Sequence, residues 1–195
     1  MEKKQKRLIF IVVLVIALAI LLNANFNQED KNSFKYNGFK VYQTEPAVYN
    51  IEIYLENDAN PHYISIRYDP RELDYIQVED DLKQRILRNE VYITLTPNLT
   101  SNSVIGVAEI AKIIGNKFLF NVPVYTALTY SKENIPVKTC SDVTVETSVI
   151  MLKLSNQTRV YRKSDCIVVE GKTEEEIVKA STKLALNLLG ITKKN

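Results

Sequence analysis

The stretch VYITLTPNLTSNSVIGVAEIAKIIG (Val91–Gly115) decides the fold, because its pattern changes from strand to helix within a short distance. Val91 to Thr96 alternates and is rich in β-branched residues, which predicts a strand. The polar loop Pro97 to Ser103 offers hydroxyl and amide groups that can cap a helix. Val104 to Ile114 is predicted to be that helix, ended by Gly115. The helix is mostly apolar, which is typical of a helix that packs on a sheet.

Strand patterns continue after this helix, at Phe118–Phe120 and Val124–Tyr130. The segment from Val91 to Tyr130 therefore predicts a βαβ unit with parallel strands. Before it, residues 39–43, 48–55 and 62–68 alternate between apolar and polar side chains, with the turn signal ENDANP between the second and third runs. These three runs predict a small antiparallel sheet, and a short helix is expected around Asp80.

The C-terminal part predicts a hairpin, a strand and a helix. Thr147–Leu154 and Arg159–Arg162 are interpreted as hairpin arms around Ser155-Asn156-Gln157, and Asp165–Glu170 as the following strand. Thr173 and Glu176 have the spacing of a capping box, and the final helix is expected to run to Leu189. The fold class is therefore α/β (or α+β), with one mixed-sheet domain and about three helices.

The segment LIFIVVLVIALAILL (Leu8–Leu22) is apolar throughout and follows four basic residues. At about 1.5 Å per residue it covers roughly 22 Å, so the flanking residues must complete a span of about 30 Å. The alternative is a cleaved signal peptide, but Leu22-Asn23-Ala24 is a poor cleavage site. We therefore expect an uncleaved signal anchor, with the N-terminus in the cytoplasm.

This interpretation divides the chain into four parts. Residues 1–7 form a cytoplasmic basic tail, 8–26 a transmembrane anchor, 27–37 a polar tether, and 38–195 an extracytoplasmic domain. About 160 residues suffice for one compact domain. The whole chain carries 25 Lys and Arg against 23 Asp and Glu, without a basic block after the anchor. Nucleic-acid binding is therefore not expected.

Cys140 and Cys166 are the two cysteines of the chain. In an exported domain such a pair most often forms a disulfide bond, which we expect here. Two buried free thiols are the alternative. Asp142 and Asp165 stand close to the cysteines in the sequence and could approach each other as a cation site. Two carboxylates without further oxygen ligands are more often simply solvated.

No catalytic constellation is recognisable in the sequence. There is one histidine, His62, on a predicted strand with isoleucines, which is typical of a structural residue. A zinc site normally draws on several His and Cys side chains. The chain has no Gly-x-Ser-x-Gly elbow, glycine-rich phosphate loop or Ser-x-x-Lys motif. We therefore expect no enzyme activity, metal or cofactor.

The best candidate for a ligand site is the loop Pro97 to Ser103, because ligands of α/β folds collect beyond the carboxyl ends of strands and near helix N-termini. An alternative is that these residues only cap the helix. The loop also contains the N-glycosylation sequon Asn98-Leu99-Thr100, and a second sequon begins at Asn156. The candidate ligand-binding residues are Asn98, Thr100, Ser101, Asn102 and Ser103.

Three stretches, Ile93–Gly115, Pro136–Leu154 and Asp165–Ala180, resemble a group of uncharacterised archaeal proteins with one N-terminal span and an α/β ectodomain. The last stretch is also similar to elements of archaeal surface-layer proteins. Neither resemblance implies an activity for particular residues.

Together these observations predict a single-pass cell-membrane protein, embedded in the lipid bilayer through Leu8–Leu22. Its outer domain is expected to have a non-enzymatic interaction or structural role with an unknown envelope or membrane protein as partner. The alternative is a membrane-tethered domain that binds a small ligand or carbohydrate through the loop Pro97 to Ser103.

Overall fold

The computed structural model describes residues 32–56, 58–131 and 134–192. The chain divides into two compact units, residues 1–34 and 35–195, and residues 32–34 are the described part of the first. The strands are β1 (Ser33–Tyr36), β2 (Phe39–Glu45), β3 (Val48–Tyr54), β4 (Pro61–Ile66), β5 (Gln77–Val78), β6 (Glu90–Leu95), β7 (Val124–Leu128), β8 (Thr147–Leu154), β9 (Arg159–Lys163) and β10 (Cys166–Gly171). The α-helices are α2 (Leu82–Ile86), α3 (Ser101–Ile114) and α4 (Glu174–Leu188), and the 3₁₀ turns are η1 (Pro70–Leu73) and η2 (Cys140–Asp142).

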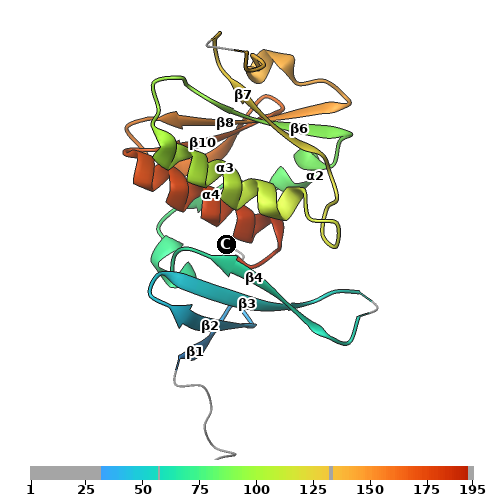
Figure 1. Ribbon diagram of the computed structural model, residues 1–195, viewed down its shortest axis with the longest axis vertical. Coiled ribbons are helices and arrows are strands. Elements are labelled where there is room, and N and C mark those ends of the chain that lie inside the picture. The colour runs from blue at the N-terminus through green and yellow to red at the C-terminus, as the bar shows by residue number, and fades with distance from the viewer. Residues whose placement is uncertain (1–31, 57, 132–133, 193–195) are drawn as a thin grey trace, which may run out of the picture. The chain divides into compact units, whose positions relative to one another are not determined.

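The larger sheet has six strands in the order β5-β9-β10-β8-β6-β7. Strands β10, β8, β6 and β7 run parallel to one another, whereas β9 is antiparallel to β10. Helices α3 and α4 lie side by side on one face of this sheet (Figure 1). The mixed α/β fold agrees with the sequence-based prediction, as do the three α-helices of the described residues.

The βαβ unit is confirmed as β6–α3–β7. Strands β6 and β7 pair in parallel from Val91↔Val124 to Leu95↔Leu128. The strand expected at Phe118–Phe120 is wrong, because these residues form a turn before β7. Asn116 stabilises the turn, since its side-chain oxygen accepts a hydrogen bond from the Phe118 N–H at 2.9 Å.

The C-terminal hairpin is formed by different strands from those expected. β8 and β9 do not pair, because β10 lies between them in the sheet. All residues of β10 are buried, so this strand takes a central place where both of its faces are covered. The hairpin joins β9 to β10 through a two-residue turn between Lys163 and Cys166, with Ser164 at φ 54°.

Helix α4 is buried on more than one side, because residues outside the larger sheet also cover it. Thr182 and Lys183 are buried as well as the apolar stripe. Lys183 Nζ lies 3.0 Å from Asp74 Oδ1, which follows η1. The helix ends at Leu188 with Leu189 as its C-cap, one residue before the predicted end. Gly190 follows, and its φ of 73° is favourable for glycine. The Gly190 and Ile191 N–H groups close the last turn as in a Schellman motif.

The smaller sheet has four strands in the order β1-β2-β3-β4. Pairing of β2 with β3 and of β3 with β4 is antiparallel, which confirms the small antiparallel unit. Strand β1 lies within residues 27–37, so Ser33–Tyr36 is not the polar tether that the sequence suggested. The smaller sheet contacts α3, because Lys112 Nζ of this helix donates a hydrogen bond to the Ser65 carbonyl oxygen of β4 at 2.5 Å.

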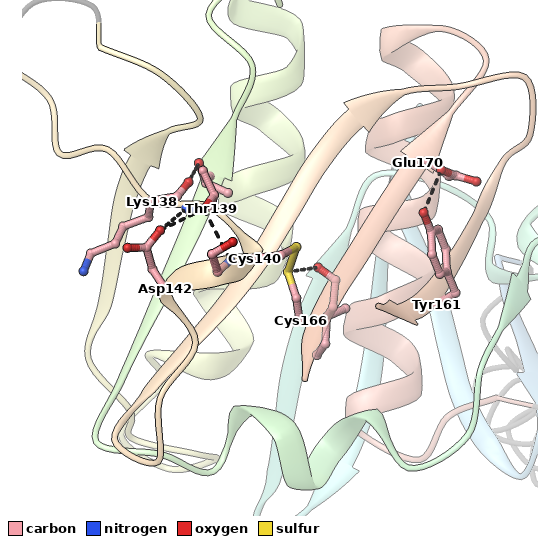
Figure 2. The surroundings of a disulfide bond; sticks show 10 residues. Lys138, Thr139, Cys140, Asp142, Tyr161, Cys166 and Glu170 are labelled. Atoms are coloured by element: carbon pink, nitrogen blue, oxygen red, sulfur yellow. Dashed lines mark hydrogen bonds between the residues drawn. A yellow bond between two sulfur atoms is a disulfide. The ribbon is translucent and has the colours of Figure 1, made fainter. Parts of the chain in front are cut away.

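Cys140 and Cys166 form the expected disulfide, with an S–S distance of 2.14 Å and a Cα–Cα distance of 5.2 Å (Figure 2). Cys140 begins η2, and Cys166 begins the central strand β10. The bond lies on the sheet face opposite α3 and α4, where Val149, Cys166 and Val168 form a buried cluster. The segment around η2, pinned by this bond, therefore covers the middle of the face that carries no helix.

The predicted membrane anchor, Leu8–Leu22, lies outside the described residues. Among the helices that are described, none is long and apolar enough to cross a membrane.

Candidate functional site

Three cavities lie near the carboxyl edge of the larger sheet. All of them adjoin the first turn of α3 or of α4, which follow β6 and β10. The first cavity, of about 230 Å³, lies against the loop before α3, and the second, of about 270 Å³, lies between the two helices. The third, of about 410 Å³, lies on the other side of the first turn of α4. This edge is therefore the candidate site.

The first cavity is mainly apolar and includes part of the predicted ligand loop. Val104 and Ile135 are large apolar side chains on its wall, exposed by 51% and 39%. Thr100 and Ser101 contribute hydroxyl groups. The lining consists of Leu95, Thr96, Pro97, Leu99, Thr100, Ser101, Val104, Leu128 and Ile135.

The predicted loop residues are distributed over different environments. Thr100 is the N-cap of α3, and its hydroxyl accepts a hydrogen bond from the Asn102 N–H at 3.3 Å. Ser103 is fully buried, whereas Asn98 is exposed. The Asn102 side chain lines the second cavity. The loop therefore supplies the edge of two cavities and does not form one pocket of its own.

Glu174, in the first turn of α4, occupies the place at the α3 N-terminus where an anion would bind. Its carboxylate accepts hydrogen bonds from the Thr100 N–H at 3.0 Å, the Thr100 hydroxyl at 2.7 Å and the Ser103 hydroxyl at 3.0 Å. Burial alone would raise the pKa of Glu174, but these hydrogen bonds outweigh it and hold this pKa below its ordinary value. A bound anion would have to displace Glu174.

The second cavity brings together side chains from three separate parts of the chain. Arg67 and Tyr68 follow β4, Asn102 and Ile105 belong to α3, and Glu175 and Val178 belong to α4. The cavity thus has a cation, a carboxylate, an amide and a phenol around a small apolar surface. Asn102 is the one member that the sequence singled out.

The third cavity is lined by polar and charged residues, and a hydrogen bond links two of them. The Tyr75 hydroxyl donates a hydrogen bond to Glu176 Oε2 at 2.6 Å. Burial and this bond raise the pKa of Tyr75, so its hydroxyl keeps its proton at neutral pH. Thr158, Lys172 and Thr173 complete the lining.

The residues weighed for catalysis or cation binding lie in separate structural contacts. His62 Nε2 is 2.7 Å from Asp58 Oδ2, and its ring is 5.6 Å from that of Phe118, which follows the far end of α3. Asp142 accepts hydrogen bonds within η2 from the Thr139 N–H at 2.7 Å. Asp165 pairs with Arg85 and Arg88. Among the described residues, no cluster of three or more His, Cys, Asp or Glu could hold a metal.

One buried charge network was missed by sequence reasoning. Glu170 is 1% exposed on the sheet face that carries the disulfide, with Lys153 Nζ 3.0 Å and Arg159 Nε 2.7 Å away (Figure 2 shows Glu170). The Tyr161 hydroxyl donates a further hydrogen bond to Glu170 at 3.3 Å. These residues meet because β8, β10 and β9 are neighbours, an order that the sequence did not reveal.

Both sequon asparagines are accessible. Asn98 and Asn156 are exposed, and each follows the carboxyl end of a strand, β6 and β8 respectively. Their use as glycosylation sites remains a prediction.

Comparisons with protein-family models, with curated proteins and with solved structures find no match to this chain.

Proposed function

We propose that this protein is a membrane-anchored, non-enzymatic binding protein whose folded domain holds a small polar ligand at the carboxyl edge of the larger sheet. The observation that carries the proposal is the set of three cavities around the first turns of α3 and α4. Concave sites of α/β folds with a few convergent polar groups are the usual places for ligands.

The non-enzymatic part of the proposal is supported by the position of the one histidine, the side chain that most often serves as a general acid or base. His62 contacts a residue that follows α3, whereas the cavities adjoin the N-terminus of that helix. A helix of this length extends for about 20 Å, so the imidazole is remote from the edge. General acid–base catalysis needs such a group within hydrogen-bond reach of its substrate.

Binding at the edge can be tested by filling it. We expect saturation-transfer NMR on the detergent-solubilised full-length protein to detect at least one compound in a mixture of sugars, amino acids, carboxylates and amines. Asn102→Trp places a large ring in the second cavity and should abolish this signal. Val145→Trp is the matched control, because Val145 is 91% exposed in the loop before β8. The absence of any signal from the mixture would contradict a site at this edge, and equal signals from wild type and Asn102→Trp would exclude the second cavity.

The anchor is supported by the apolar run Leu8–Leu22 and its basic N-terminal flank. We expect the protein to sediment with membranes and to remain there after a carbonate wash. An impermeant amine reagent applied to whole cells should label lysines after Lys31 and spare Lys3, Lys4 and Lys6. Recovery of the protein in the soluble fraction, or labelling confined to the segment before Leu8, would contradict this topology.

A structural or protein-interaction role is the second candidate. It is favoured by the exposed apolar side chains of Val104 and Ile135 at the first cavity. A partner retained on the tagged, membrane-extracted protein but lost from Val104→Glu would support this role.

A further inference from the structure

We propose that the second cavity binds a small zwitterion, a molecule that carries both a carboxylate and an ammonium group, such as a free amino acid or a dipeptide. The inference rests on the proposed function, and it names the ligand class of one part of the edge. It assigns the carboxylate of the ligand to Arg67 and the ammonium group to Glu175, with Tyr68 and Asn102 as neutral partners.

Arg67 can receive a carboxylate because its own ion pair is long and its side chain is open. Its Nε lies 3.7 Å from Glu109 Oε1, beyond hydrogen-bond distance, and the side chain is 58% exposed. A guanidinium presents several N–H donors in a planar fork that matches a carboxylate. The contact with Glu109 therefore orients Arg67 without occupying its donors.

Glu175, another residue of the cavity lining, can receive an ammonium group. One of its oxygens, Oε1, lies 2.9 Å from Lys179 Nζ, and the side chain is 67% exposed. Within the described part of the chain, Lys179 is the ion-pair partner of Glu175. A carboxylate can accept several hydrogen bonds, so Glu175 keeps capacity for a second cation.

The neutral groups of the cavity are also available. Neither the Tyr68 hydroxyl nor the side-chain amide of Asn102 bonds to another residue that the structure describes. The side chain of Lys179 lies over the Tyr68 ring at 5.5 Å from its centroid, which holds the wall in place. Ile105 and Val178 contribute apolar surface, suited to the carbon skeleton of a small ligand.

The charges favour a zwitterion over a ligand of one sign. An anion attracted by Arg67 would be repelled by Glu175, and a cation attracted by Glu175 would be repelled by Arg67. A neutral sugar would add no opposite charge to either group. At about 270 Å³ the cavity is smaller than the usual drug-sized pocket of 300–1,000 Å³, a size that suits an amino acid or dipeptide.

Calorimetric titration of the full-length protein in detergent tests this assignment. The probes are alanine, leucine and alanyl-alanine, with acetate, methylamine and glucose as comparisons. We expect the zwitterions to bind at least tenfold more tightly than the comparison compounds. The ligand class is identified by which compound binds more tightly, the amino acid or the dipeptide.

Two charge-removing variants locate the binding. Arg67→Gln and Glu175→Gln should each weaken zwitterion binding at least tenfold, whereas Lys163→Gln, at the exposed end of β9, should leave it unchanged. Glu175 is exposed, so Glu175→Gln provides a folded variant even if Arg67→Gln perturbs the contact with Glu109. Circular dichroism checks that each variant is folded.

The assignment is overturned if the zwitterions give no binding heat at millimolar concentration, or if both variants bind them as the wild type does. Binding of glucose or acetate alone, blocked by Asn102→Trp, would overturn the zwitterion while leaving the proposed function intact. If the wild type binds neither the zwitterions nor any compound of the wider mixture, both the zwitterion assignment and the proposed function are overturned.

Discussion

Glu170 is a carboxylate held almost out of water between two cations. Its side chain is 1% exposed, and the Lys153 and Arg159 groups that bond to it stand on the neighbouring strands β8 and β9. The Arg159 guanidinium also lies over the Tyr161 ring at 4.4 Å. A buried charge without its partners is costly, whereas this one is paired on both sides. Glu170 therefore ties three strands together through side chains as well as through the backbone.

Glu170→Gln should lower the free energy of unfolding by about 1–3 kcal/mol, because the amide cannot replace both charge-assisted hydrogen bonds. Urea denaturation at pH 7 measures the loss. Glu45→Gln, at an exposed position, is the control and should change stability by less than about 0.5 kcal/mol. Equal midpoints for the two variants would contradict a stabilising role for the network.

The same residue predicts a dependence of stability on pH. Burial alone would raise the pKa of Glu170, but the bonds and charges of Arg159 and Lys153 outweigh it, so this pKa lies below its ordinary value of 4.5. The stabilisation is therefore present above pH 4.5 and is lost as pH falls through the folded-state pKa. Between pH 5 and roughly pH 2, Glu170→Gln should lose less stability than the wild type. Parallel loss in both proteins would exclude this contribution.

Sequence reasoning at the residue scale found what local rules control. Thr173 was predicted as a helix cap, and it is the N-cap of α4. The cap of α3 was expected within the loop Pro97 to Ser103, and it is Thr100, so α3 begins at Ser101, before the predicted Val104. Glu170 was assigned to a strand, but its partners depend on which strands are neighbours. Arg67 likewise gains its role from α3 and α4, which follow it in the sequence, so no local pattern marks it as a cavity residue.

At the scale of elements, the pairing of the strands was harder to predict than the strands themselves. The βαβ unit was predictable because a single crossover helix joins β6 to β7. The pairing of β8 with β9 was predicted from the short link between them, and it is wrong. The burial of β10 on both faces, which places it between them, depends on α3, α4 and the disulfide-bonded segment together.

The contact between α3 and α4 depends on Gly106. A Cβ atom at this position would lie 2.7 Å from Ser181 Oγ and 3.3 Å from a Leu152 methyl group. The Ser181 hydroxyl is buried and makes no hydrogen bond among the described residues. The two small residues therefore let the helices approach each other closely above β8.

Gly106→Ala should destabilise the protein by about 1–3 kcal/mol through overpacking, against a gain of about 1 kcal/mol in helix propensity. Ser181→Ala removes an unbonded hydroxyl and should be neutral or stabilising. The double variant should be more stable than the sum of the single changes by about 0.5 kcal/mol or more. Urea denaturation of all four proteins provides the cycle, and additivity would show that the two positions do not touch.

At the scale of the whole molecule, the two faces of the larger sheet are covered in different ways. Helices α3 and α4 cover one face (Figure 1). A sheet with this many parallel strands normally has helices on both faces, but here the segment around η2 covers the middle of the other. Cys140 and Val143 from this segment pack on Val149 and Val168. The disulfide fixes this short cover, which has little regular structure of its own.

Cys140→Ala combined with Cys166→Ala should therefore lower the free energy of unfolding by about 3–4 kcal/mol, as expected for opening a loop of 26 residues. The loss should be accompanied by faster hydrogen exchange in β10, because Val168 loses the cover of η2. Alkylation under denaturing, non-reducing conditions provides the control on the wild type, which should gain no adduct until a reductant is added. Two adducts without reductant would mean that packing alone holds the segment on the sheet, since the closed loop would then contribute nothing to stability.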